Sequence, residues 1–173
     1  MEVDPVAPSG PAAGGFAAAA PGHRRSRPAY ERQVIGFLKE LVPTGGLVLD
    51  VGAGTGVLTG QLHRAGLRVI AVESTADGVR QLALALPSVP VLSARSDALA
   101  VRDACVDLLV VAGDHDREDP VWDEALRVLA PGATLALVRP AATRPEAVWQ
   151  LDGFAGASLR SEVDTEVRTW TRS

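Results

Sequence analysis

The chain has little cysteine, no long apolar run and no excess of basic residues. Its one cysteine, Cys105, cannot form an internal disulfide, so we expect a cytoplasmic protein. No stretch is apolar over the length of a membrane helix, and the N-terminus lacks the early positive charge of a signal peptide. A net charge of −4 argues against a general nucleic-acid-binding surface. These absences predict that neither a membrane nor a nucleic acid is a partner.

The length of 173 residues suits one domain with a sizeable core. A hydrophobic fraction of 47% with 22% charged residues is ordinary for a globular protein. Residues 1–15 are rich in proline, alanine and glycine, which predicts a disordered tail. We expect residues 31–173 to form the single domain.

Residues 47–56 are the most informative stretch of the chain. They form a short apolar run that contains Asp50 and is followed by Gly52-Ala53-Gly54 and Gly56. The run predicts a buried parallel strand, and the apolar spacing after it predicts a helix that begins near Gly56. In a strand–glycine turn–helix unit, backbone N–H groups face the carboxyl edge of the sheet, and glycine lets a ligand approach the backbone.

The spacing of these glycines excludes two common nucleotide-binding motifs. The dinucleotide pattern Gly-x-Gly-x-x-Gly needs a glycine where Val57 stands, and no Gly-Lys-Ser/Thr follows for a P-loop. The order is instead Asp-x-Gly-x-Gly-x-Gly. It resembles the first motif of class I S-adenosylmethionine-dependent methyltransferases.

Glu73 closes the next expected strand, Arg68–Glu73, about twenty residues after the glycines. A carboxylate in this place can accept hydrogen bonds from both ribose hydroxyls, and we include its neighbour Ser74 in the same site. A solvated surface glutamate is the plain alternative. A nicotinamide cofactor would require the same acidic residue, so Glu73 does not distinguish the two adenosine ligands.

The remaining pattern alternates helices and strands. Helices are expected over 31–41, 75–85, about 122–129 and 145–151, and strands over 91–94, 106–112 and 134–138, with one or two antiparallel strands within 157–170. Pro131-Gly132 should end a helix and turn the chain into the fifth strand. The fold class is therefore α/β: a Rossmann-like three-layer αβα sandwich with a mostly parallel seven-stranded sheet, complete or truncated, and an antiparallel C-terminal strand.

Further segments resemble the type 11-like group of these methyltransferases. Residues 94–99 resemble its adenine-contact loop, which implies that Ser96 and Asp97 contact the base. Residues 124–137 resemble its Arg-Val-Leu-x-Pro-Gly-Gly corner. Ala112, at the end of the fourth strand, is also expected at the cofactor. His115 stands one position early for the family's His-Trp pair and is a weak catalytic candidate beside the plain alternative of a solvated surface histidine.

The resemblance also extends to residues 16–30. Phe16, Arg27, Pro28 and Tyr30 match an opening that many relatives carry, whereas His23 replaces a tyrosine. The resemblance implies that residues 16–30 form a lid over the cofactor, with His23, Arg27 and Tyr30 in contact with it. A basic linker is the alternative.

Together these features predict methyl transfer from S-adenosylmethionine to a small-molecule acceptor, with no metal. The resemblance implies that Asp50 interacts with the methionine end of the cofactor, directly or through water, and that Glu73 holds the ribose. Two alternatives stay open: a cofactor-binding protein without catalysis that acts through a partner, and a nicotinamide-dependent oxidoreductase. The second is disfavoured because no Tyr-x-x-x-Lys or comparable hydride-transfer group is present. The oligomeric state, a dimer included, stays open.

Overall fold

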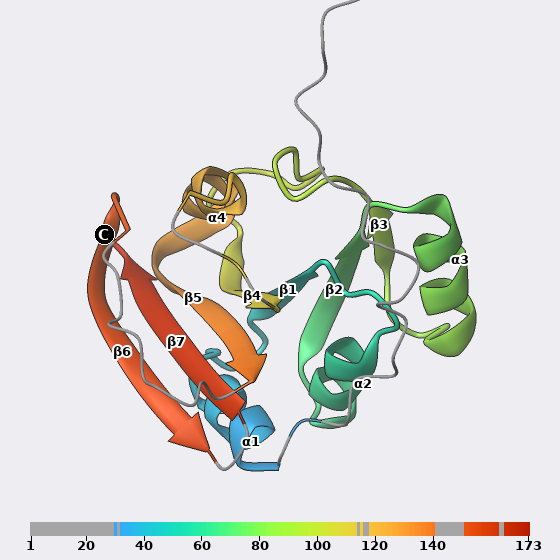
Figure 1. Ribbon diagram of the computed structural model, residues 1–173, viewed down its shortest axis with the longest axis horizontal. Helices are drawn as coiled ribbons and strands as arrows, with labels where there is room; N and C mark the ends of the chain where they lie inside the picture. Colours follow the sequence, from blue (N-terminus) through green and yellow to red (C-terminus); the bar gives the residue numbers. More distant parts are fainter. Residues whose placement is uncertain (1–29, 31, 114, 116–117, 141–150, 163–164) are drawn as a thin grey trace, which may run out of the picture.

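The computed structural model is built on one seven-stranded sheet (Figure 1). It describes residues 30, 32–113, 115, 118–140, 151–162 and 165–173, and the side chains of 140 and 156–162 are not described. The helices are α1 (Arg32–Glu40), α2 (Val57–Arg64), α3 (Ala76–Ala85) and α4 (Val121–Val128). The strands are β1 (Leu47–Val51), β2 (Arg68–Glu73), β3 (Val91–Ser93), β4 (Val106–Ala112), β5 (Leu129–Pro140), β6 (Phe154–Glu162) and β7 (Thr165–Arg172).

The strand order is β3-β2-β1-β4-β5-β7-β6. Strands β3, β2, β1, β4 and β5 pair in parallel, whereas β7 is antiparallel to both β5 and β6. The chain passes from β1 outwards to β2 and β3 and returns to place β4 on the other side of β1. The carboxyl end of β1 is therefore the switch point of the sheet, where ligands bind in open α/β folds. The expected Rossmann-like fold with seven strands is confirmed.

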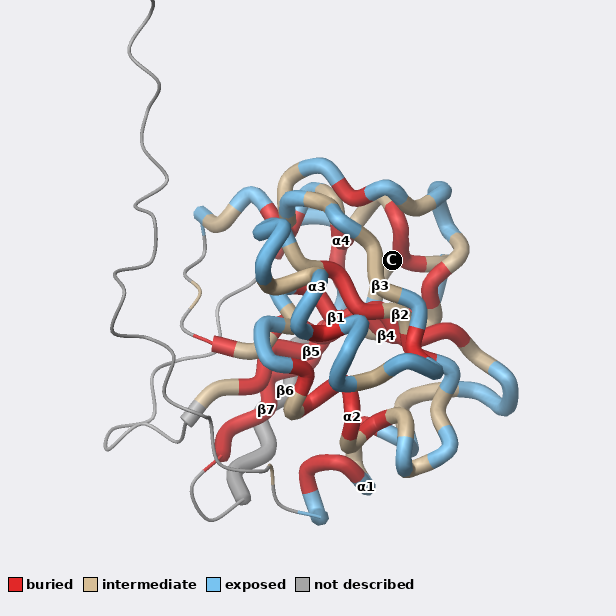
Figure 2. Tube along the Cα trace, turned by 90° about the vertical axis from the view of Figure 1, so that its right-hand side faces the viewer, coloured by how far each residue is buried: buried red, intermediate tan, exposed pale blue. Residues whose placement is uncertain are grey.

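Helices cover both faces of the sheet and bury its strands. Helices α1 and α2 pack on the face that carries Val48 and Leu108, and α3 covers Ala71 near the β3 edge. Helix α4 packs on the opposite face, against a cluster that includes Leu109 and Trp170. All five residues of β1 are buried, as expected for a central parallel strand. Figure 2 shows this arrangement as buried strands inside largely exposed loops and outer helix faces.

The C-terminal hairpin, β6 and β7, completes the sheet. Strand β7 lies between β5 and β6, and its residues 165–170 are all buried. The buried set includes two charged residues, Glu166 and Arg168, at 3% and 0% exposure. Arg168 pairs with Glu166, and Arg139 of β5 donates from Nε to Glu166 Oε1 at 2.9 Å. The sequence predicted one or two antiparallel strands here, and the structure has two, but it did not predict this buried ion-pair cluster.

The fifth strand begins earlier than expected. We expected Pro131-Gly132 to end a helix before a strand at Thr134, but α4 ends at Val128 and β5 begins at Leu129. Val106 pairs with Leu129 and Leu108 pairs with Thr134, so the residues between them, including Pro131 and Gly132, form an irregularity within the strand. The expected helix over 145–151 lies outside the described residues except for Leu151, as do residues 1–29.

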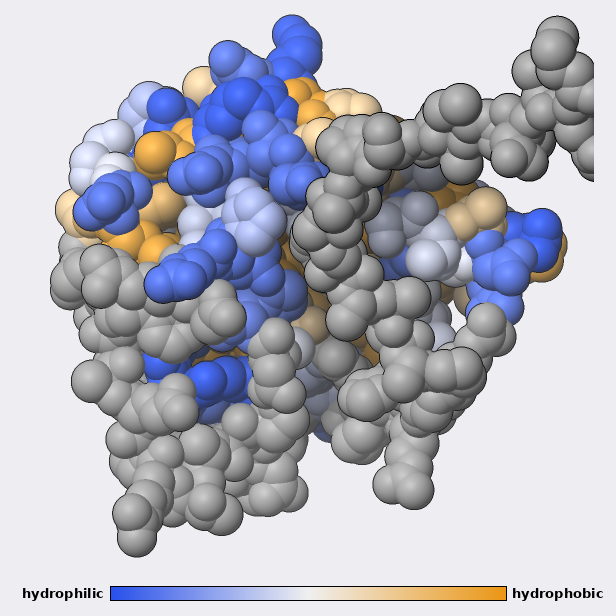
Figure 3. Space-filling view, turned by 45° about the horizontal axis from the view of Figure 1, so that its top comes forward, coloured by the Kyte–Doolittle hydropathy of each residue, from blue (hydrophilic) through white to orange (hydrophobic). Residues whose placement is uncertain are grey.

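Hydrophilic residues predominate in the described part of one face of the molecule (Figure 3). Figure 3 shows hydrophilic side chains over much of one face, with apolar residues in smaller patches between them. Leu84 of α3, at 78% exposure, is the large hydrophobic residue that stands out to solvent among the described residues. Within the same part of the chain, no helix has the length and apolar character to cross a bilayer.

Candidate functional site

The loop that joins β1 to α2 lies at the switch point and is shaped by three glycines. Gly52, Gly54 and Gly56 all have positive φ, at +73°, +57° and +78°. The N–H groups of Gly52 and Ala53 both donate to the carbonyl of Val72 on β2, at 2.9 Å each. These bonds fold the loop back over β2, so that the loop and the end of β2 form one surface.

The glycines serve two different purposes. A Cβ on Gly52 would meet nothing within 4 Å, and one on Gly54 would meet only the Gly52 carbonyl oxygen at 3.8 Å. Both residues are exposed, so open space adjoins the backbone there. A Cβ on Gly56 would lie 2.3 Å from Cδ1 of Leu82, because α2 packs closely against α3 at that point. The first two glycines thus leave room for a ligand, and the third leaves room for a helix.

Glu73 lies beside the glycine loop at the end of β2. Its Oε2 accepts from the Gly54 N–H at 3.1 Å, and its Oε1 accepts from the N–H and Oγ1 of Thr75 at 3.0 and 2.9 Å. The same Thr75 Oγ1 accepts from the Gly78 N–H and so caps α3. The structure therefore brings Glu73 and the glycines together, as predicted, and places the exposed Ser74 next to them.

Gly78 leaves the space that the Glu73 side chain occupies. A Cβ at residue 78 would lie 2.6 Å from the Cγ of Glu73 and 2.6 Å from Oγ1 of Thr75. Gly78 was not predicted from the sequence. The spacing Thr75-x-x-Gly78 at the start of a helix was the available signal, because a threonine N-cap binds the N–H three residues later.

Asp50 lies beneath the loop rather than in it. It is 1% exposed, and its Oδ2 accepts from Oγ1 of Thr59 on α2 at 2.5 Å. Thr59 is itself fully buried. A buried carboxylate needs hydrogen bonds to offset its lost hydration, and this bond ties β1 to the first turns of α2. Thr59 was not predicted, since a threonine inside a helix carries no local sign of such a partner.

Ser96 and Asp97 follow β3 and reach the same edge of the sheet. The Ala94 N–H donates to the carbonyl of Glu73 at 3.2 Å, which joins this loop to the end of β2. Arg95 holds both Asp97 oxygens, Nε to Oδ1 at 2.8 Å and Nη2 to Oδ2 at 2.6 Å. This pairing lowers the pKa of Asp97 and raises the pKa of Arg95.

Ala112 ends β4, next to β1, and His115 lies in the loop that follows. Ala112 pairs with Val138 of β5. His115 Nδ1 lies 2.7 Å from Asp119 Oδ2, and Asp119 Oδ1 accepts from the Val121 N–H at the start of α4. The imidazole also meets the Trp122 ring edge-on, with centroids 6.0 Å apart. Asp119 thus fixes the histidine ring relative to α4.

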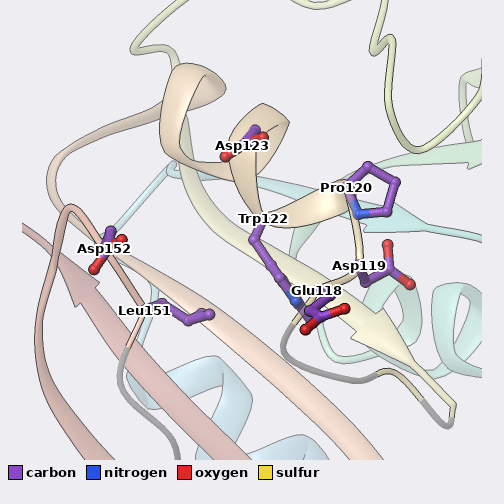
Figure 4. Close-up of a pocket in the computed structure, with 7 residues that line it drawn as sticks. All are labelled: Glu118, Asp119, Pro120, Trp122, Asp123, Leu151 and Asp152. Carbon is purple, nitrogen blue, oxygen red and sulfur yellow. The ribbon is translucent and has the colours of Figure 1, made fainter.

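A cavity of about 320 Å³ adjoins this loop. It lies between residues 118–123 and the segment that precedes β6, from which Leu151 points towards Trp122 (Figure 4). Its lining residues are Glu118, Asp119, Pro120, Trp122, Asp123, Leu151 and Asp152. The four carboxylates would disfavour an anionic ligand in this cavity. No group of three or more His, Cys, Asp or Glu side chains among the described residues is arranged to hold a metal.

The predicted lid is represented by one described residue. The Tyr30 N–H donates to Gln61 Oε1 at 2.9 Å, and Gln61 Nε2 donates to the Tyr30 carbonyl at 2.7 Å. The amide of Gln61 on α2 thus holds both backbone groups of Tyr30. His23 and Arg27 lie outside the described residues.

Comparison with known proteins gives a consistent result. Residues 48–132 match a family described as "Methyltransferase domain". The chain is 37% identical over 125 residues to an uncharacterized methyltransferase of Mycobacterium tuberculosis, an alignment that covers 71% of this chain and 51% of that protein. The chain therefore spans about half the length of the curated relatives it matches.

Solved structures of methyltransferases are among those similar to this chain. A putative type II methyltransferase from Anaeromyxobacter dehalogenans is 32% identical, with a TM-score of 0.59 over 70% of this chain and 52% of that one. A SAM-dependent methyltransferase from Aquifex aeolicus has a TM-score of 0.61 over 80% of this chain and 88% of that one. Its identity is 20%, so it supports the fold alone.

Proposed function

Because the chain belongs to the class I S-adenosylmethionine-dependent methyltransferases, we propose that it transfers a methyl group from S-adenosylmethionine to a small-molecule acceptor. The observation that carries the proposal is the contact between the Gly54 N–H and Glu73 Oε2 at the switch point of the sheet. The loop and the carboxylate form one polar surface beside open backbone at Gly52 and Gly54. This surface fits the ribose and amino-acid parts of an adenosine cofactor.

We assign the cofactor-binding roles as follows. Glu73 accepts hydrogen bonds from the ribose hydroxyls. These bonds replace the ones that its carboxylate accepts from Gly54 and Thr75 in the structure. Gly52, Ala53 and Gly54 give the methionine part access to the backbone. Asp50 acts on the methionine part of the cofactor through the glycine loop above it or through water, because its carboxylate is 1% exposed.

The other predicted residues complete the pocket. Ser96 and Asp97 face the adenine, Ser74 and Ala112 border the site at the ends of β2 and β4, and Gly56 shapes the loop. His23, Arg27 and Tyr30 belong to a covering segment, for which the two hydrogen bonds between Gln61 and Tyr30 supply a fixed end.

The cofactor brings an activated methyl group on a positively charged sulfur, so the protein mainly aligns the acceptor with it. An acceptor that loses a proton on methylation needs a base nearby. Among the described residues, His115 is the best candidate, because Asp119 engages Nδ1 and orients Nε2 for proton transfer. In His115→Gln we expect a lower kcat with unchanged affinity for S-adenosylhomocysteine. An unchanged kcat would show that His115 does not act as the base.

Calorimetric titration with S-adenosylmethionine, S-adenosylhomocysteine and NADH tests the proposal. We expect micromolar binding of the first two, weakened at least tenfold by Glu73→Ala, because two charge-assisted hydrogen bonds are lost. Glu40→Ala, which removes an exposed carboxylate at the end of α1, is the matched control and should bind normally.

The outcomes separate the rival functions. Tight binding of NADH alone would overturn the proposal in favour of an oxidoreductase. Binding of the methyl donor without a methylated product, across a broad set of acceptors, would favour a cofactor-binding protein that acts through a partner. If none of the three ligands binds, the proposal that the chain has a cofactor pocket is refuted.

A further inference from the structure

Helix α4 carries an ion pair that holds a distant loop. Arg127 donates from Nε to Glu124 Oε1 and from Nη2 to Oε2, both at 2.7 Å. It also donates from Nη2 to the Leu99 carbonyl and from Nη1 to the Val101 carbonyl, at 2.8 Å each. The Leu99 N–H donates to Glu124 Oε2 at 2.6 Å. One Glu–Arg pair therefore binds both backbone groups of Leu99, which lies 25 residues before Glu124 in the chain.

The loop needs such support because it has little structure of its own. Residues 94–105 join β3 to β4 without a helix, and a single bridge pairs Arg95 with Ala98. Leu99 is 5% exposed and anchors the loop in the core. Asp103 adds a contact to Arg127 Nη1 at 2.6 Å. The conformation of the loop is therefore set largely from α4.

Ser96 and Asp97 lie between two fixed points of this loop. On one side the Ala94 N–H is bound to the Glu73 carbonyl, and on the other Leu99 is bound to Glu124 and Arg127. Arg127 lowers the pKa of Glu124, chiefly through its hydrogen bonds to the Glu124 carboxylate. The ion pair thus fixes the loop at Leu99, two residues after Asp97.

We infer that Glu124 and Arg127 are positioning residues that set the loop of Ser96 and Asp97 for recognition of the cofactor's adenine. The inference rests on the proposed function and extends it to the selection of the base. Arg127 supplies a planar fork of donors that reaches two carbonyls and two carboxylates together, which a lysine cannot reproduce. Glu124 aligns the fork and accepts from the loop itself.

The test compares S-adenosylhomocysteine with S-inosylhomocysteine, in which the adenine amino group is replaced by oxygen. Wild type, Arg127→Met, Arg127→Lys and Glu124→Gln are titrated with both ligands by calorimetry. Arg80→Met is the matched control, because Arg80 forms the same i,i+3 pair with Asp77 on α3, and both side chains are more than 60% exposed. Thermal unfolding of each variant accompanies the titrations.

We expect wild type to prefer the adenine ligand. Arg127→Met and Arg127→Lys should lose about tenfold or more in affinity for it, the equivalent of about one hydrogen bond. They should lose much less for the inosine ligand, so that the preference shrinks. Glu124→Gln should show a smaller change in the same direction, and Arg80→Met should match wild type.

Several results would refute the inference. Equal loss of affinity for both ligands would indicate general destabilisation, and an unchanged preference in Arg127→Lys would show that the fork does not set the loop. If Arg127→Met does not fold, Arg127→Lys and Glu124→Gln decide the question. Wild type that binds both ligands equally also refutes it, whereas wild type that binds neither refutes the proposed function instead.

Discussion

Replacing Gly56 by alanine should destabilise the protein strongly. Gly56 has φ +78° at the start of α2, a conformation that costs an L-residue about 1–2 kcal/mol. The added Cβ would also lie 2.3 Å from Cδ1 of Leu82 and 3.0 Å from Cδ1 of Leu86. Leu82 is fully buried, so its side chain has little room to give way, and such overpacking costs about 1–3 kcal/mol. We expect a total loss of about 2–5 kcal/mol in the free energy of unfolding.

Urea unfolding followed by circular dichroism measures this loss. With a slope of about 2 kcal/mol per molar urea, the midpoint should fall by about 1–2.5 M at unchanged slope. Gly36→Ala is the matched control, because Gly36 is exposed within α1 and an added Cβ meets nothing within 4 Å. It should raise the free energy of unfolding by about 0.5–1 kcal/mol. A Gly56→Ala midpoint equal to that of wild type would show that the packing of α2 against α3 is not as described.

Three further predictions concern buried and paired groups, and urea unfolding measures each. Glu166→Gln should lower the free energy of unfolding by about 3–5 kcal/mol, because the guanidiniums of Arg139 and Arg168 lose the carboxylate that they share. A loss below about 1 kcal/mol would contradict this. Thr59→Val should cost about 1–3 kcal/mol by removing the donor to Asp50, whereas Thr59→Ser should cost less; equal losses would exclude the hydroxyl as the cause. The hydrogen bonds from Arg127 lower the Glu124 pKa below its usual value of 4.5. The ionised Glu124 therefore stabilises the folded protein fully above pH 4.5, and this contribution is lost as the pH falls through the lowered folded-state pKa. Glu124→Gln should therefore lose less stability than wild type on acidification below about pH 4.5, and parallel pH profiles would contradict this.

The fold and the centre of the site could be predicted because their signals are local. The glycine loop follows β1 within a few residues, and Glu73 ends the next strand, so periodicity and spacing placed both at one edge of the sheet. The Gly54–Glu73 contact then brings them together. Which residues bind a ligand stays a prediction.

The remaining features depend on contacts between distant parts of the chain. From the sequence, Arg127 is one residue of an amphipathic helix, but it contacts Leu99 and Val101, which lie 28 and 26 positions earlier in the chain. The early start of β5 was missed because Pro131-Gly132 usually ends an element, whereas here Leu129 already pairs with Val106. Glu166 and Arg168 read as the solvent side of an alternating strand, but both faces of β7 are covered.

The position of β7 between β5 and β6 constrains how the protein folds. Strand β6 precedes β7 in the chain but forms its strand pairing only with β7, so β6 cannot take its native place in the sheet until β7 has paired with β5. The hairpin must therefore form first and dock as a unit, or β7 must bind alone and β6 follow. Both routes delay closure of the core around Trp170 until after β5 is in place. The antiparallel end of the sheet should consequently be a late step in refolding, during which the β5 edge is exposed to pairing with other chains.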